Sequence, residues 1–286
     1  MILAHDRVVA PDAAPERWML VLHGVYGAGR NWGSVARTFV RARPEWGILL
    51  VDLRLHGDSR GFEPPHTLEA CADDVKRLVA HVGLAADAVL GHSFGGKVAL
   101  LYLRDAGAEC RGVGPVATPD LTWVVESTPA SRPPEGSAWA MLDVLRASAG
   151  PFPDRAAGIA AVEASGFPNP VAQWMVTNLV PAAGAAPSAS PRELVWRLDA
   201  DDMEALLRDF FRTDAWSVLE DPPGGSQVHV VKARESSVLD EASSERVEEA
   251  GRVTEGRVLL HHLDGGHWVN ADDSEGLHRL LMEYMP

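Results

Sequence analysis

The chain has 286 residues, of which 46% are hydrophobic and 23% charged, so it has enough apolar material for a large folded core. Its formal net charge of −14 argues against nucleic acid or an anionic membrane surface as the main partner. The two cysteines argue against a disulfide scaffold, and there is neither a signal-like leader nor an apolar run of the roughly 18 residues that a transmembrane helix requires. We therefore expect a cytoplasmic protein. Composition does not determine the oligomeric state, and a monomer or homodimer is expected.

Short apolar runs alternate with helical patterns in the first part of the chain, which is typical of a mostly parallel sheet covered by helices. Strands are predicted within 18–24 and 46–59, and a helix within 66–84. Residues 86–107 predict a strand, a tight turn and a helix, and a weaker strand pattern covers 111–119.

The alternation stops between residues 120 and 217, where only helices are predicted, together with a linker of small residues at 181–191. It then resumes with strands at 226–233 and 257–263, each followed by a helix. We therefore predict an α/β domain formed by residues 1–119 and 218–286, interrupted by a helical insertion over 120–217. Aromatic residues of the insertion either line an apolar pocket or pack it onto the core: Trp139, Trp174, Trp196, Phe210, Phe211 and Trp216.

The strongest chemical signal is the sequence Gly91-His92-Ser93-Phe94-Gly95, which fits the pattern G-x-S-x-G. It lies between an apolar strand pattern and a helical pattern, as a nucleophile elbow requires. A serine on such a sharp turn needs small residues two positions before and after it. Ser93 is therefore the predicted nucleophile.

Acyl transfer also needs two N–H donors for the oxyanion and a general base. The donors are predicted to be the amides of Phe94, which follows the nucleophile, and of Val25, in the loop after the first strand. Among eleven histidines, His267 lies in a loop after the last predicted strand, in the order Ser…acid…His. His267 is therefore the predicted base.

Four stretches together resemble the α/β-hydrolase-fold serine esterases, in the branch of bacterial acyl esterases and related mitochondrial and plant abhydrolase proteins: LHGVYG, VDLRLHGDS, GHSFGGKVAL and GGHWVNADD. The resemblance implies an α/β-hydrolase fold with the insertion as a helical cap. It further implies a Ser–His–acid hydrolase that cleaves a small-molecule ester or thioester, with no cofactor and no metal.

The acid stays open at this point. Most α/β-hydrolases carry it after the strand that is here 226–233, where Ser236 takes the usual Asp position and Glu235 is one residue away. The branch resembled here often moves the acid to the preceding strand, in an Asp-x-x-Pro-like stretch. Matching that proline to Pro119 places Val116 at the acid position, so the nearest carboxylate, Asp120, is preferred and Glu235 is the alternative. A site without an acid remains a third option.

Other functions are compatible with the same Ser–His pair. A carbon–carbon bond hydrolase or a cofactor-free haloperoxidase would use the same two residues. A relative that only binds a ligand is the alternative from another class, and a missing acid would favour it. Our prediction is a serine hydrolase that cleaves a carboxylic ester or thioester with a hydrophobic acyl or aryl group.

Overall fold

The structure is a computed structural model that describes residues 1–109, 113–182 and 193–286. Its centre is a seven-stranded sheet with the order β1-β3-β2-β4-β5-β8-β9, in which only β1 runs antiparallel to its neighbour. The strands are β1 (His5–Val8), β2 (Arg17–Leu22), β3 (Trp46–Val51), β4 (Ala88–His92), β5 (Leu121–Val125), β8 (Gln227–Ala233) and β9 (Val258–Leu263). The central strands are almost continuous apolar runs because helices cover both faces of the sheet.

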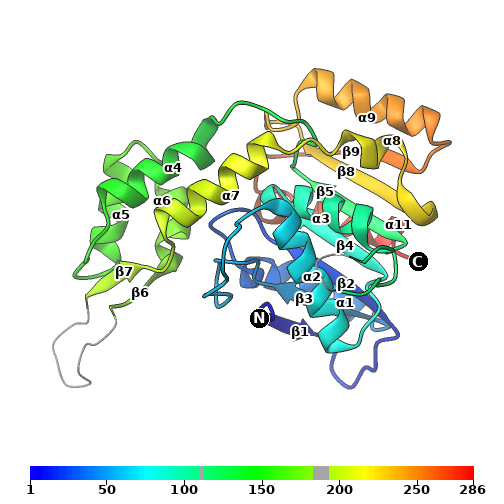
Figure 1. Cartoon of the computed structure of the whole chain (residues 1–286), viewed down its shortest axis with the longest axis horizontal. Coiled ribbons are helices and arrows are strands. Elements are labelled where there is room, and N and C mark those ends of the chain that lie inside the picture. Colours follow the sequence, from blue (N-terminus) through cyan, green and yellow to red (C-terminus); the bar gives the residue numbers. More distant parts are fainter. Residues whose placement is uncertain (110–112, 183–192) are drawn as a thin grey trace.

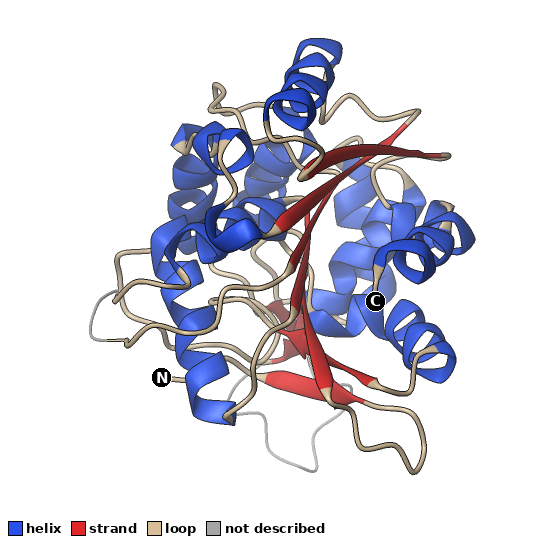
Figure 2. Ribbon diagram, turned by 90° about the vertical axis from the view of Figure 1, so that its right-hand side faces the viewer, coloured by secondary structure: helices blue, strands red, loops and turns tan. Residues whose placement is uncertain are grey.

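Helices pack on both faces of this sheet, as Figure 2 shows with the sheet seen nearly edge-on. One face is covered by α2 (Leu68–Val82), α3 (Phe94–Asp105), α8 (Trp216–Glu220) and α9 (Glu241–Val253). The other is covered by α1 (Gly33–Ala42) and α11 (Ser274–Tyr284), and short helices η1 (Gly29–Trp32), η3 (Pro223–Gly225) and α10 (Val269–Asp272) lie in connections. The predicted α/β-hydrolase fold is confirmed.

Local signals explain where the elements begin and end. Helix α2 begins after Thr67, whose hydroxyl accepts a hydrogen bond from the amide of Ala70 at 3.1 Å. It ends at Gly83, which has a left-handed φ of 66° that glycine adopts without strain. The helix predicted within 66–84 therefore begins and ends at its own capping residues.

The helical insertion projects from one side of the sheet domain (Figure 1). It contains α4 (Gly136–Ala147), α5 (Arg155–Ala164), α6 (Asn169–Met175), η2 (Val176–Asn178), the hairpin strands β6 (Leu179–Pro181) and β7 (Leu194–Trp196), and α7 (Ala200–Arg212). We call residues 136–212 the cap. Of the predicted linker 181–191, residues 183–191 lie outside the described residues.

Two expectations need correction in this region. The strand expected at 111–119 lies at 121–125 instead: β5 pairs with β4 and β8, whereas residues 113–119 form none of the seven strands. The sheet domain therefore continues past residue 119, because Leu121–Val125 is a buried run in the middle of the sheet. The expectation of helices alone over 120–217 also missed the β6–β7 hairpin.

Lys97 fixes both chain segments that join the cap to the sheet domain. The side chain of this α3 residue is buried, and its Nζ donates to the carbonyls of Ala130 (2.8 Å), Phe210 (2.7 Å) and Thr213 (2.8 Å). The two segments also bond to each other, from the Arg132 amide to the Phe211 carbonyl at 2.7 Å and from the Ala215 amide to the Pro129 carbonyl at 2.9 Å. Lys97 thus ties both of these segments to α3.

We predict that Lys97→Met loosens this base, because three carbonyls lose their donor at once. Hydrogen exchange at the amides of Arg132 and Ala215 should become at least tenfold faster, which corresponds to about 1.4 kcal/mol of local stability. Lys232→Met is the matched control, since Lys232 makes a single side-chain bond of 3.2 Å to Ser244. Unchanged exchange at both amides in Lys97→Met would contradict the prediction.

Candidate active site

Ser93 lies at the turn between β4 and α3, with φ 53° and ψ −116°, a conformation that a non-glycine residue rarely adopts. The flanking glycines are required by close backbone contacts. A Cβ on Gly91 would lie 2.1 Å from the Gly95 carbonyl oxygen, and one on Gly95 would lie 2.4 Å from the Leu22 carbonyl oxygen. The turn therefore has the strained strand–turn–helix geometry of a nucleophile elbow.

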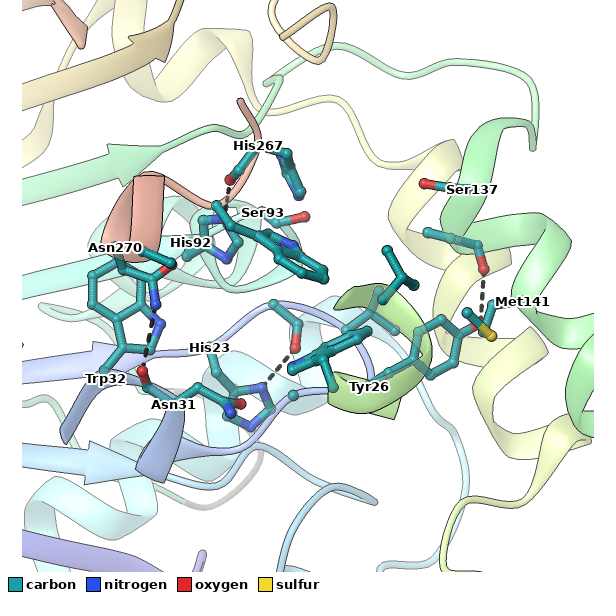
Figure 3. A pocket seen from close by; sticks show the side chains of 18 of the residues that line it. His23, Tyr26, Asn31, Trp32, His92, Ser93, Ser137, Met141, His267 and Asn270 are labelled. Atoms are coloured by element: carbon teal, nitrogen blue, oxygen red, sulfur yellow. Dashed lines mark hydrogen bonds between the residues drawn. The ribbon is translucent and has the colours of Figure 1, made fainter. Parts of the chain in front are cut away.

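The loop after β2, residues His23–Gly27, lies against the nucleophile turn and lines the same pocket as Ser93 (Figure 3): a Cβ on Gly24 would be 3.3 Å from the Cβ of Ser93. The Gly27 amide donates to the Gly24 carbonyl at 3.0 Å, which closes a tight turn. The side chain of His23 connects this turn to the loop after β3. Its Nδ1 donates to the Gly24 carbonyl at 2.7 Å, and its Nε2 accepts from the Leu53 amide at 3.0 Å. Burial lowers the pKa of His23 to about 4, so the ring is neutral near pH 7.

The two expected oxyanion donors belong to the loop after β2 and to the start of α3. Val25 lines the same pocket as Ser93. Phe94 is the first residue of α3, so its amide has no carbonyl partner within the helix, and the positive end of the helix dipole points to Ser93. Their placement is compatible with a two-donor oxyanion site.

His267 lies in the loop between β9 and α10, and its Nδ1 is 3.2 Å from Oε2 of Glu126. Glu126 follows β5 directly and its side chain is fully buried. Its other oxygen, Oε1, accepts a 2.6 Å bond from the Ala233 amide at the end of β8. Because an ionised carboxylate only accepts hydrogen bonds, this contact assigns the proton of neutral His267 to Nδ1 and leaves Nε2 free to accept one.

This contact departs from the sequence expectation, because the carboxylate beside His267 is neither Asp120 nor Glu235. Asp120 precedes β5 whereas Glu126 follows it, so about 20 Å of extended chain separates the two carboxylates. Glu235 is exposed, and its amide bonds to the Gly265 carbonyl at 3.0 Å. The carboxylate that His267 Nδ1 contacts is Glu126.

A signal for Glu126 was present in the sequence. Glu126-Ser127-Thr128-Pro129 has the acid-x-x-Pro spacing that the resemblance implies, with Glu in place of Asp. The match to Pro119 depends on the strand expected at 111–119. Val116, the position inferred from that match, precedes β5 as well.

His92 contributes a second fixed point for His267. Its Nε2 donates to the His267 carbonyl at 2.8 Å, and the two rings lie 4.8 Å apart between centroids (Figure 3). Burial lowers the pKa of His92 to about 3, so this histidine is neutral near pH 7. We call residues 264–268, which carry His267, the histidine loop. The carbonyl of His267 bonds to His92 in the nucleophile turn, and its ring contacts Glu126.

Ser93, His92 and His267 line a cavity of about 430 Å³ between the sheet domain and the cap. The cap contributes a mainly apolar wall: Ser137, Ala138, Met141, Phe167, Pro168, Val171 and Trp174. Among the described residues, the lining includes no Asp, Glu, Lys or Arg. Of the six cap-region aromatics considered from the sequence, Trp174 lines the cavity, whereas Trp216 packs in the core with α9.

Within the described ranges, no group of three or more His, Cys, Asp or Glu is arranged to hold a metal ion. No helix in residues 1–109, 113–182 and 193–286 combines the length and the apolar character needed to cross a bilayer.

The chain matches the model of the α/β hydrolase family over residues 19–280, and it belongs to this family. It is 25% identical to the sn-1-specific diacylglycerol lipase ABHD11 of Mus musculus over 267 residues, which covers 89% of this chain and 76% of the relative. The resemblance stated from the sequence is confirmed, as is the expectation of an esterase-type hydrolase at the level of the family and its relatives.

Solved structures share the fold at low sequence identity. A marine microorganism esterase superposes with a TM-score of 0.80 at 16% identity, over 99% of both chains. The thioesterase domain from the curacin biosynthetic pathway superposes with a TM-score of 0.66 at 16% identity, over 99% of this chain and all of that domain. These likenesses support the fold.

Buried neutral histidines predict a loss of stability in mild acid. Burial lowers the folded-state pKa of His23 to about 4 and those of His56, His92 and His229 to about 3. The unfolded chain binds protons below about pH 6.5 whereas the folded chain does not, so the free energy of unfolding falls between pH 6.5 and 4. Each histidine contributes at most about 1.4 kcal/mol per pH unit. Urea denaturation at pH 7, 6 and 5 measures this slope.

His229→Phe tests the origin of the slope, because His229 stacks on Trp123 in the core, away from the cavity. The variant should show a shallower decline, by up to about 1.4 kcal/mol per pH unit near pH 5. His81→Gln, which replaces an exposed histidine of α2, should keep the wild-type slope. Equal slopes in all three proteins would rule out a contribution from His229.

Proposed function

We propose that this protein is a serine hydrolase that cleaves a carboxylic ester or thioester through an acyl-enzyme on Ser93. The contact of buried Glu126 with Nδ1 of His267, a residue that lines the same cavity as Ser93, is the observation that carries the proposal. A carboxylate on His267 supports a Ser–His–acid triad and disfavours a relative that only binds a ligand.

The reaction begins with attack by Ser93 Oγ on the acyl carbonyl, while His267 Nε2 takes the hydroxyl proton. Negative charge develops on the carbonyl oxygen and is stabilised by the amides of Val25 and Phe94. Protonated His267 then gives its proton to the leaving alcohol or thiol, which leaves an ester on Ser93. Water, activated by His267 in the same way, releases the acid and restores the serine.

Glu126 orients His267 and stabilises its imidazolium in both steps. The carboxylate is removed from solvent, so its attraction to the developing positive charge is screened less than at the surface. The bond from the Ala233 amide holds Oε1 and leaves Oε2 for the histidine. A glutamate in this position thus does the work that an aspartate does in most triads.

The proposed substrate has an uncharged, hydrophobic acyl or aryl group. The lining lacks ionised carboxylates and amines among its described residues, and a buried charge without a partner is costly. A cavity of about 430 Å³ accommodates a group of limited size in an apolar environment. Esters are favoured by the lipase relative, and thioesters remain within the proposal because they react by the same steps.

Replacement of the nucleophile tests the proposed activity. Wild-type protein should hydrolyse p-nitrophenyl esters and be labelled at one site by a fluorophosphonate, whereas Ser93→Ala should lose labelling and at least about 10⁴-fold in kcat. A series of acyl lengths should show an optimum set by the cavity. Folded wild-type protein that stays unlabelled at Ser93 would sink the proposal.

Replacement of the acid separates Glu126 from the two carboxylates expected from the sequence. Glu126→Gln should lower kcat by about 10³- to 10⁴-fold, because the amide cannot stabilise the imidazolium and favours the wrong histidine tautomer. Asp120→Asn and Glu235→Gln are the matched controls and should keep the wild-type kcat. A normal kcat in Glu126→Gln, or a large loss in either control, would assign the acid elsewhere.

A further inference from the structure

The loop that carries Val25 is hydrogen-bonded to the cap at two points, both through Tyr26. The Tyr26 hydroxyl donates to the carbonyl of Ala138 in α4 at 2.8 Å. The Tyr26 carbonyl accepts a bond of 2.8 Å from Nδ2 of Asn178 in η2. Figure 3 shows the Tyr26 side chain extended toward α4, across the cavity from Ser93.

Tyr26 holds a backbone conformation that the loop does not favour by itself. Its φ is 62°, and it is the third residue of the turn from Gly24 to Gly27. With positive φ only at that position the turn is of type II, which strongly prefers glycine there. A tyrosine keeps this conformation only where its surroundings fix it, and here both bonds from the cap act on Tyr26.

Asn178 and Tyr26 are both almost fully buried, at 1% and 2% exposure, so water does not compete for either bond in this structure. Burial also raises the pKa of the Tyr26 hydroxyl well above its usual range, so it stays protonated and able to donate. The loop is therefore held between two supports, His23 on the sheet side and the cap on the other.

The cap also touches the histidine loop. Trp174 of α6 packs on Trp268, the residue after His267, with 5.2 Å between ring centroids. Two of the loops that meet at Ser93 thus contact the cap directly. Acyl transfer is sensitive to such placement, because an error of about 1 Å in a catalytic group can cost about 10²-fold in rate.

We propose that Tyr26 and Asn178 are positioning residues that couple closure of the cap to assembly of the oxyanion site. With the cap closed, their two bonds hold the Val25 amide toward the oxyanion. When the cap opens, Tyr26 loses both partners and the turn relaxes, so substrate enters a site that is not yet competent. This inference rests on the proposed acyl transfer at Ser93.

The test compares Tyr26→Phe and Asn178→Ala with wild type in p-nitrophenyl butyrate hydrolysis. Each variant should lose about 10- to 100-fold in kcat, with KM within about threefold, because the oxyanion exists in the transition state and not in bound substrate. The rate of inactivation by a fluorophosphonate, which also forms an oxyanion, should fall by a similar factor. A role in packing alone would lower the melting temperature without this split.

Two matched controls separate the bonds from the loss of a buried polar group. Tyr102→Phe removes a buried hydroxyl that has no hydrogen-bond partner among the described residues. Thr177→Val removes a hydroxyl adjacent to Asn178 that bonds within the cap to the Trp174 carbonyl at 2.7 Å. Both should keep the wild-type kcat.

The outcomes are distinguishable. Folded Tyr26→Phe and Asn178→Ala with wild-type kcat and inactivation rate, or a loss confined to KM, would overturn the coupling while leaving the Ser93 proposal standing. If Asn178→Ala does not fold, Tyr26→Phe decides alone, since it removes one oxygen atom. A wild-type protein without turnover or labelling would overturn the proposed function, and this inference with it.

Discussion

The contact between the buried Glu126 carboxylate and His267 is the interaction on which the rest of the site depends. It requires the ends of three strands to meet, because Glu126 follows β5, the Ala233 amide closes β8, and the histidine loop follows β9. These strands are parallel neighbours, so their carboxyl ends lie at one edge of the sheet. A one-residue shift of β5 would turn the carboxylate to the other face and leave a buried charge without a partner.

Strain is concentrated at the same edge. Six non-glycine residues of the described chain have positive φ, and three of them belong to this region: Tyr26, Ser93 and Glu126. Such conformations cost about 1–3 kcal/mol each and persist only where the surroundings fix them. The surroundings here are specific, since Glu126 is held by Ala233 and His267 while Tyr26 is held by Ala138 and Asn178. The sheet domain and the cap together stabilise backbone conformations that Tyr26 and Glu126 would not adopt in an isolated loop.

Sequence reasoning reached the fold because its signals are local: the apolar runs of β2, β3 and β4, the capped α2 and the glycines around Ser93. It missed β5 because Leu121–Val125 comes directly after an acidic residue at the expected start of the insertion. With the strand expected at 111–119, the proline of the acid-x-x-Pro pattern is matched to Pro119 instead of Pro129. Glu126 then lies outside the match. The contact of Glu126 with His267 joins residues 141 positions apart, and no local pattern reports such a distance.

The cap both lines the cavity and contacts the loop that carries Val25, and these two functions are connected. It supplies the apolar wall against which an acyl group would lie, and the same segment bonds to Tyr26 in the loop that carries Val25. Lys97, four residues after Ser93 on α3, fixes both ends of that segment to the helix that begins at the nucleophile. Contacts with an acyl group that favour the closed cap would therefore also favour the bonded state of Tyr26. Binding energy from a part of the substrate that does not react would then be expressed in the transition state, which is how remote contacts raise kcat.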